Sequence, residues 1–72
     1  MNKRVQYLVE GITKDIICFL MEDGYELNEA FGVFYNSETF AKLTDEETGL
    51  YIESSSHVYE ILKGEQKYGK IQ

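Results

Sequence analysis

The chain has 72 residues, and its hydrophobic content of 43%, with six tyrosines and four phenylalanines, is typical of a folded chain. Thirteen Asp and Glu against seven Lys and Arg give a formal net charge of −6, which weighs against nucleic acid and anionic membrane surfaces as partners. One cysteine and one histidine allow neither an internal disulfide nor a four-ligand structural zinc site. Self-association is therefore the remaining way to reinforce so small a fold.

We expect one domain, residues 1–72, without a membrane segment. The longest apolar run has six residues, whereas a transmembrane helix needs about twenty. Glu10, Lys14 and Asp15 also interrupt the apolar region that a signal peptide would require. A cytoplasmic location is therefore expected, and the single free thiol agrees with it.

The first expected element is a long helix that stops near Asp23 and Gly24, since glycine readily adopts the left-handed conformation of a helix C-cap. Apolar residues before this point recur at spacings of three and four, which places them on one face of a helix. These residues are Val5, Leu8, Val9, Ile12, Ile16, Phe19 and Leu20.

The same helix carries a second group of apolar side chains on its other side. This group consists of Tyr7, Ile17, Cys18 and Met21, which lie among Lys3, Glu10 and Lys14. Residues 16–21 are therefore apolar nearly all round, and such a helix must be covered on two sides. We expect the second cover to come either from the last helix of the same chain or from another copy.

Two short helices are expected next. The first covers residues 27–35, where apolar residues follow the i, i+3, i+4, i+7, i+8 pattern, and Asn28 is a suitable N-cap residue. A break follows at residues 36–37, after which Ser37 caps a third helix that extends to Leu43.

The remaining chain begins with a polar turn, residues 44–49, and a brief extended stretch, residues 50–53, that is too short to predict a strand. Serines at 54–56 offer N-caps for a last helix, which ends at Gly64 or continues to Gly69. The whole pattern predicts an all-α fold: a compact small bundle of about four helices, with a long first helix, two short helices and one C-terminal helix.

No catalytic, cofactor-binding or metal-binding residue is predicted. Acidic residues 45–47 and Glu53 lack the spacing of a calcium loop, so a solvated turn is expected there. His57 lies beside serines, but neighbours at a helix start seldom present the geometry of a base and a nucleophile, and a surface histidine is expected. The dispersed glycines form no phosphate-binding loop. The sequence thus predicts no cofactor and no enzyme.

Cys18 and the tyrosines are the remaining candidates. Cys18 lies between Ile17 and Phe19, where burial would make a thiol unreactive, so a structural or interface cysteine is predicted. The tyrosines are either peripheral core residues or contact residues, because a tyrosine buries a large ring while its hydroxyl stays wet. The candidate interface comprises Tyr7, Ile17, Cys18, Met21, Tyr51 and Tyr59.

The second half of the chain contains a series of short motifs: Phe-Tyr-Asn-Ser at 34–37, Lys-Leu at 42–43, Thr-Gly-Leu-Tyr-Ile-Glu-Ser at 48–54 and Val-Tyr-Glu-Ile-Leu at 58–62. With these motifs, about residues 25–63 resemble a family of short uncharacterised bacterial proteins. Relatives tend to carry proline where this chain has Ser55, and proline would suit the first helical position. The resemblance implies a small helical domain of unknown function, often encoded in operons suspected to be toxin–antitoxin-like or phage-related.

The leading hypothesis is a protein–protein interaction module or accessory protein that binds a partner protein or itself as a homodimer, with an antitoxin-like role implied by the resemblance. The alternative is a DNA-associated regulator with a helix-turn-helix joined at residues 36–37. The second helix of such a pair should carry basic and amide side chains, whereas residues 37–43 offer only Lys42.

Overall fold

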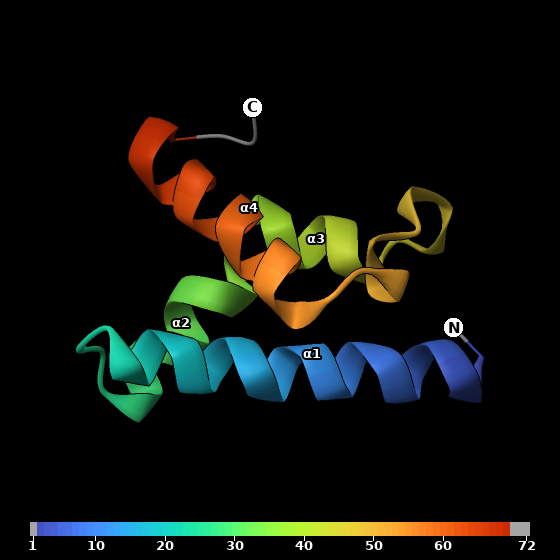
Figure 1. Cartoon of the computed structure of the whole chain (residues 1–72), viewed down its shortest axis with the longest axis horizontal. Helices are drawn as coiled ribbons and strands as arrows, with labels where there is room; N and C mark the ends of the chain where they lie inside the picture. Colours follow the sequence, from blue (N-terminus) through green and yellow to red (C-terminus); the bar gives the residue numbers. More distant parts are fainter. Residues whose placement is uncertain (1, 70–72) are drawn as a thin grey trace.

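The long first helix, α1 (Lys3–Glu22), forms one side of the molecule; α2 and α4 pack against it, and α3 packs on α4 and α2 (Figure 1). This computed structural model describes residues 2–69 of the chain. After α1 come α2 (Leu27–Tyr35), α3 (Glu38–Thr44), the 3-10 turns η1 (Glu46–Thr48) and η2 (Leu50–Ile52), and α4 (Ser55–Tyr68). Residues 2–69 contain no strand, so the predicted all-α bundle of about four helices is confirmed.

Local signals at both ends of α1 explain its bounds. The Val5 N–H donates a hydrogen bond to Oδ1 of Asn2 at 2.9 Å, which satisfies one of the free donors of the first turn. The helix ends at Asp23 and Gly24 as predicted, and Gly24 has a φ of 108°. Only glycine adopts such a conformation at little cost, so the chain can reverse here and lead into α2.

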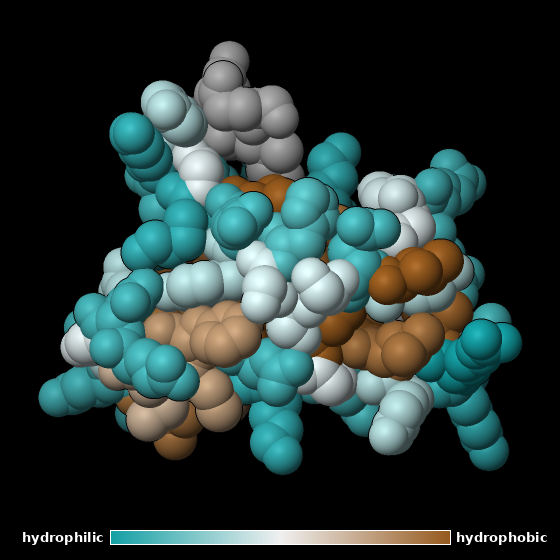
Figure 2. Space-filling view, viewed as in Figure 1, coloured by the Kyte–Doolittle hydropathy of each residue, from teal (hydrophilic) through white to brown (hydrophobic). Residues whose placement is uncertain are grey.

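The core lies between α1 and the other helices. Its apolar members are Val5, Val9, Ile12, Ile16, Ile17, Leu20, Ala30, Phe34, Leu43, Val58 and Leu62. Most of the predicted apolar face of α1 belongs to this core, whereas Leu8 and Phe19 are half-buried. Figure 2 shows the outside of one face, where hydrophobic patches lie among hydrophilic side chains.

The expected cover over the second side of α1 is only partly present, and it does not come from the last helix. α4 packs along the side of α1 that holds Asp15 and Phe19. α2 instead lies over Ile17, which is 5% exposed, while Cys18 and Met21 remain exposed. The chain therefore leaves part of this side of α1 open to solvent.

The N-cap of α2 differs from the prediction. The cap is Glu26, not Asn28: the Glu26 N–H donates to Oε1 of Glu29 at 2.9 Å, and the Glu26 carboxylate accepts from the Glu29 N–H. This reciprocal capping box satisfies two donors at once, and Asn28 lies exposed within the first turn.

Two caps hold the N-terminus of α3. Ser37 accepts a hydrogen bond from the Phe40 N–H at 3.0 Å, as predicted. The carboxylate of Glu65, on α4, accepts from the Glu38 N–H at 2.8 Å, from the Thr39 N–H at 2.9 Å and from the Thr39 hydroxyl at 2.7 Å. The hydroxyl of Thr39 is fully buried and paired, so Glu65 both caps α3 and joins it to α4.

The expected extended stretch at residues 50–53 is wrong, because Leu50–Ile52 forms the 3-10 turn η2. Gly49 precedes it in a left-handed conformation with a φ of 67°, and its carbonyl accepts from the Ile52 N–H at 3.1 Å. These local hydrogen bonds coil the segment, and only Glu53 at its end is extended.

α4 takes the longer of its two predicted lengths. It begins after Ser54, whose hydroxyl accepts from the His57 N–H at 3.1 Å, and continues through Gly64 to Tyr68. An internal glycine costs a helix only about 1 kcal/mol, and the contacts of Glu65 with α3 hold the next turn in place. Gly69, with a φ of 79°, ends the helix.

Within residues 2–69, none of the helices has both the length and the apolar character that crossing a membrane requires.

Candidate functional site

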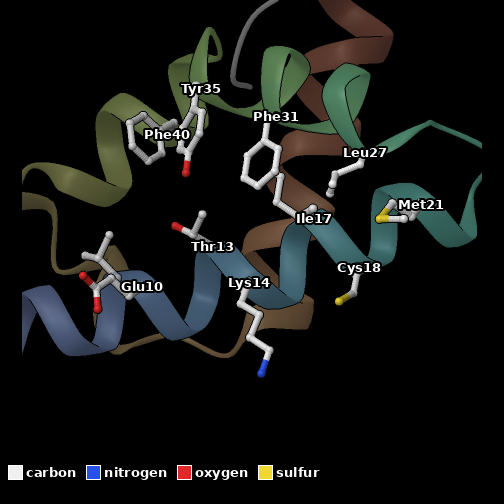
Figure 3. A pocket seen from close by; sticks show the side chains of 11 residues that line it. Glu10, Thr13, Lys14, Ile17, Cys18, Met21, Leu27, Phe31, Tyr35 and Phe40 are labelled. Atoms are coloured by element: carbon white, nitrogen blue, oxygen red, sulfur yellow. The ribbon is translucent and has the colours of Figure 1, made fainter.

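An open apolar groove with a volume of about 510 Å³ runs between α1 and α2 and reaches the start of α3 (Figure 3). Ile17 and Met21 line it on α1, and Leu27, Phe31 and Tyr35 line it on α2. We call this hollow the α1–α2 groove. It is the place where the second apolar side of α1 stays uncovered.

The α2 wall of the groove follows from a second apolar stripe on this short helix. Ala30 and Phe34 are fully buried and face the core. Leu27, Phe31 and Tyr35 are spaced by four residues, so they align on a neighbouring face one helical turn apart. Leu27 is 49% exposed and Tyr35 is 48% exposed. α2 therefore presents apolar surface on two sides, and only one of them is covered by its own chain.

Aromatic rings make the α2 and α3 side of the groove rigid. The ring centroids of Phe31 and Tyr35 are 5.5 Å apart in a stacked arrangement, and those of Tyr35 and Phe40 are 4.9 Å apart, edge to face. Both arrangements are favoured geometries for aromatic pairs. Figure 3 shows the Tyr35 hydroxyl directed toward α1, on the side of Thr13.

The α1 side of the groove has an apolar floor and a more polar edge. Ile17 and Val9 are 5% and 7% exposed and belong to the floor. Glu10, Lys14 and Cys18 are exposed and form the edge. Figure 3 shows the Lys14 side chain extending away from α2, so its charge does not occupy the groove.

A contact with α4 holds the turn that closes one end of the groove. The Tyr59 hydroxyl donates a hydrogen bond to the carboxylate of Asp23, and Nζ of Lys63 lies 3.0 Å from the same carboxylate. These two contacts hold the pKa of Asp23 below its ordinary value of 3.8. Burial, together with the hydrogen bond to Asp23, raises the pKa of Tyr59 above its ordinary value of 10.0.

The neighbouring Tyr25 is held in a similar way. Its hydroxyl accepts a hydrogen bond from Nε2 of Gln66 at 3.1 Å. Residues 23–25 are thus attached to α4 by side chains from three of its turns, and this attachment fixes where α2 begins relative to α1.

The groove brings together three of the six predicted interface residues. Ile17 forms its floor, and Cys18 and Met21 lie at its edge. Tyr7 is 76% exposed and precedes this edge on α1. The other two lie elsewhere. Tyr51 is half-buried and lines a second hollow of about 610 Å³ beside the N-terminal half of α1, and the half-buried Tyr59 packs on Phe19 with centroids 5.1 Å apart.

Sequence reasoning missed the other wall of the groove. The apolar pattern of residues 27–35 predicts an amphipathic helix but does not place Leu27 or Tyr35 in the candidate interface, whereas both are about half exposed and line the groove with Phe31 and Phe40. A usable signal was present, because α2 carries core positions at 30 and 34 and a second set at 27, 31 and 35. Two sets of apolar side chains on a helix of nine residues provide more apolar surface than a single contact with the core requires.

The remaining chemical candidates lie apart from the groove. His57 is exposed, with its Nε2 3.9 Å from Oε1 of Glu53. Asp45 accepts a hydrogen bond from the Glu47 N–H at 3.0 Å, and residues 2–69 contain no group of three or more side chains suited to holding a metal ion. Cys18 is not buried by its own chain: the thiol is exposed because its side of α1 is left uncovered, and an interface role for it stays a prediction.

The two helices of the proposed helix-turn-helix, α2 and α3, are joined at Asn36 and Ser37. Lys42 is the basic residue that α3 carries, and Glu38 lies in its first turn. This second helix is short, at seven residues, and nothing in its charge favours a DNA duplex.

Comparison of the chain with family models, with curated proteins and with solved structures found no match in any of the three. The resemblance to short bacterial proteins therefore rests on the sequence pattern of about residues 25–63 alone.

Proposed function

We propose that this protein is a cytoplasmic, non-catalytic interaction module that holds a helix of a partner protein in the α1–α2 groove. The observation that carries the proposal is apolar surface left uncovered on two neighbouring helices. Met21, Leu27 and Tyr35 are each between 45% and 49% exposed. A contiguous exposed apolar patch on a soluble protein usually marks a contact site.

The length of the groove suits a helix of about three turns. Val9 and Met21 are separated by twelve residues of α1, which is about 18 Å at 1.5 Å per residue. A partner helix of about three turns would fill this length. An amphipathic helix binds such grooves through apolar side chains at i, i+3, i+4 and i+7. These side chains would contact Leu27, Phe31 and Tyr35, which lie one helical turn apart on α2.

The chemistry of the walls favours contact. Phe31, Tyr35 and Phe40 offer ring surface that is already ordered by mutual packing. Preordered aromatic side chains are typical of the residues that contribute most to binding, because they bury much area and lose little freedom. The cytoplasmic location in this proposal agrees with a lone cysteine that has no internal partner.

The resemblance to small bacterial proteins adds a more specific form of the proposal. In an antitoxin-like role, the helix held in the groove would belong to a toxin encoded beside this protein. The groove would hold a toxin helix in the same way as any other amphipathic helix.

The test uses a fluorescent, uncharged amphipathic peptide of about 14 residues, and it compares two variants. Leu27→Asp places a charge in the groove, and an acidic residue suits the first turn of a helix, so α2 should still form. Ile52→Asp makes the same change at a side chain that is 70% exposed and lies outside the groove. We expect Leu27→Asp to weaken binding at least about tenfold and Ile52→Asp to leave it unchanged.

Light scattering at micromolar concentration separates this proposal from self-association. A monomeric wild type that binds the peptide supports the proposal. A wild-type dimer that Leu27→Asp converts to a monomer would show that a second copy covers the groove, and would overturn it. Equal peptide binding by both variants would also overturn it, because the groove would then not be the site.

A further inference from the structure

We infer that the partner helix is basic and that its positive side chains lie over the turn between α1 and α2. This inference rests on the proposed function above. It also uses a second observation, the uneven distribution of charge along the chain. This distribution is independent of the apolar character of the groove.

The formal net charge of −6 equals the charge of a single segment, residues 15–41. Residues 15–41 contain six acidic side chains and no Lys, Arg or His. The rest of the chain carries seven acidic and seven basic side chains, which balance. The acidic segment comprises the C-terminal half of α1, all of α2 and the start of α3, and these are the elements that build most of the groove.

Acidic side chains lie at the turn that joins the two walls of the groove. Glu22 ends α1 and Glu26 is the N-cap of α2, whereas Glu29, two residues after Leu27, lies on the other side of α2 from this groove wall. All three carboxylates belong to exposed residues. The capping box holds Glu26 and Glu29 through backbone N–H groups, which fixes their position without neutralising their charge.

Within residues 2–69, the only ion pair that a Lys forms at this turn is Lys63 with Asp23. Glu22, Glu26 and Glu29 form no ion pair with a Lys or Arg of residues 2–69, and the N–H groups at the start of α2 partly offset the charges of Glu26 and Glu29. At the other end of the groove, Glu10 and Lys14 line the edge with one charge of each sign. The charges beside the groove are thus acidic at the turn and of both signs along the edge formed by Glu10 and Lys14.

A basic helix would use both features of this surface. Its apolar face would contact Ile17, Leu27 and Phe31, while Lys or Arg side chains at one end would lie near the glutamates. Complementary charge of this kind steers association and fixes register more than it raises affinity. Its effect should also weaken as salt is added, since these charges are exposed and screened over about 8 Å at physiological ionic strength.

The experiment compares three helical peptides that share one apolar face and differ on the polar face, where they carry Lys, Gln or Glu. Their dissociation constants are measured by fluorescence anisotropy at low salt and at about 0.5 M salt. We expect the Lys peptide to bind about tenfold more tightly than the Gln peptide at low salt, and the Glu peptide to bind most weakly. These differences should shrink at high salt.

A matched pair of triple variants locates the effect. Glu22→Gln, Glu26→Gln and Glu29→Gln together remove the local charge, and glutamine can still form a capping box. Glu46→Gln, Glu47→Gln and Glu60→Gln change the net charge equally at exposed positions outside the groove. We expect only the first set to abolish the preference for the Lys peptide, while binding of the Gln peptide stays the same in both.

The outcomes separate this inference from the proposed function. If the Lys and Gln peptides bind the groove equally at low salt, the inference is overturned and the interaction module stands. If both triple variants lose the preference equally, net charge rather than the turn is responsible, and the inference is again overturned. If none of the peptides binds, the proposed function itself is overturned.

Discussion

The hydroxyl of Tyr59, in the middle of α4, donates a hydrogen bond to the carboxylate of Asp23, which ends α1. The ring of Tyr59 also packs on Phe19, and Lys63, one turn further along α4, pairs with the same carboxylate. α4 thus holds the C-terminal end of α1, where the chain turns toward α2. The position of the groove's acidic end depends on this contact, although no residue of α4 lines the groove.

Tyr59→Phe tests this relationship. The change removes the hydroxyl and keeps the ring on Phe19, so we expect a stable fold whose melting temperature is lower by a few degrees. Tyr7→Phe is the matched control, because it removes the same hydroxyl from a side chain of α1 that is 76% exposed. Thermal unfolding followed by circular dichroism measures both variants. Equal melting temperatures for the two would mean that the bond to Asp23 does not stabilise the protein.

Acid sensitivity should arise in part from Glu65. Burial acts to raise the pKa of this carboxyl, but hydrogen bonds from the Thr39 hydroxyl and from the Glu38 and Thr39 N–H groups outweigh it and hold the pKa below 4.5. A carboxyl whose pKa is lowered by folding contributes stability above its unfolded pKa, and this contribution is lost as the pH falls through the folded pKa. Stability should therefore decline below about pH 4.5.

Urea unfolding of the wild type and of Glu65→Gln at neutral and acidic pH measures this contribution. We expect Glu65→Gln to cost about 1 to 2 kcal/mol at neutral pH and to lose less stability than the wild type on acidification. Thr39→Val, which removes only the buried hydroxyl, should cost about 1 kcal/mol. Parallel curves for the wild type and Glu65→Gln across the pH range would rule out this role for Glu65.

The sequence was informative for most helix ends, because these depend on near neighbours. The end of α1 at Asp23 and Gly24, and the caps at Ser37 and Ser54, follow from residues three or fewer positions away. The spacing of apolar residues on α1 identified most of its core face for the same reason. These signals survive folding because the contacts they predict are made within one helical turn.

Several features that escaped prediction depend on residues distant in sequence, whereas the Glu26 cap of α2 and the turn at residues 50–52 depend on local contacts. Glu65 caps α3 from 26 and 27 positions away, and no local pattern indicates that pairing. The α2 wall of the groove escaped because an apolar stripe looks the same whether a neighbour covers it or not. The coiling of residues 50–52 follows from Gly49 and local hydrogen bonds that outweigh a weak alternating pattern.

Two glycines should respond in opposite ways to alanine. Gly11 lies inside α1, is exposed, and has open space where a Cβ would be, so Gly11→Ala should stabilise the protein by about 0.5 to 1 kcal/mol. Gly24 has a φ of 108°, and Gly24→Ala should cost at least about 1 kcal/mol. Urea midpoints provide the comparison. A neutral Gly24→Ala would mean that the turn between α1 and α2 does not need this conformation.

The exposed thiol of Cys18 makes the edge of the groove accessible to labelling. Because this side of α1 is uncovered, the native protein should react with a maleimide within about tenfold of the rate of the urea-unfolded chain. A bulky fluorescein maleimide on Cys18 should then weaken binding of the amphipathic peptide, since the dye would lie at the groove's edge. The control carries Cys18→Ser with Ile52→Cys, which moves the same dye outside the groove. Fluorescence anisotropy of a peptide with a second dye measures both proteins, and equal peptide affinity in the two would exclude the edge formed by Cys18 from the contact surface.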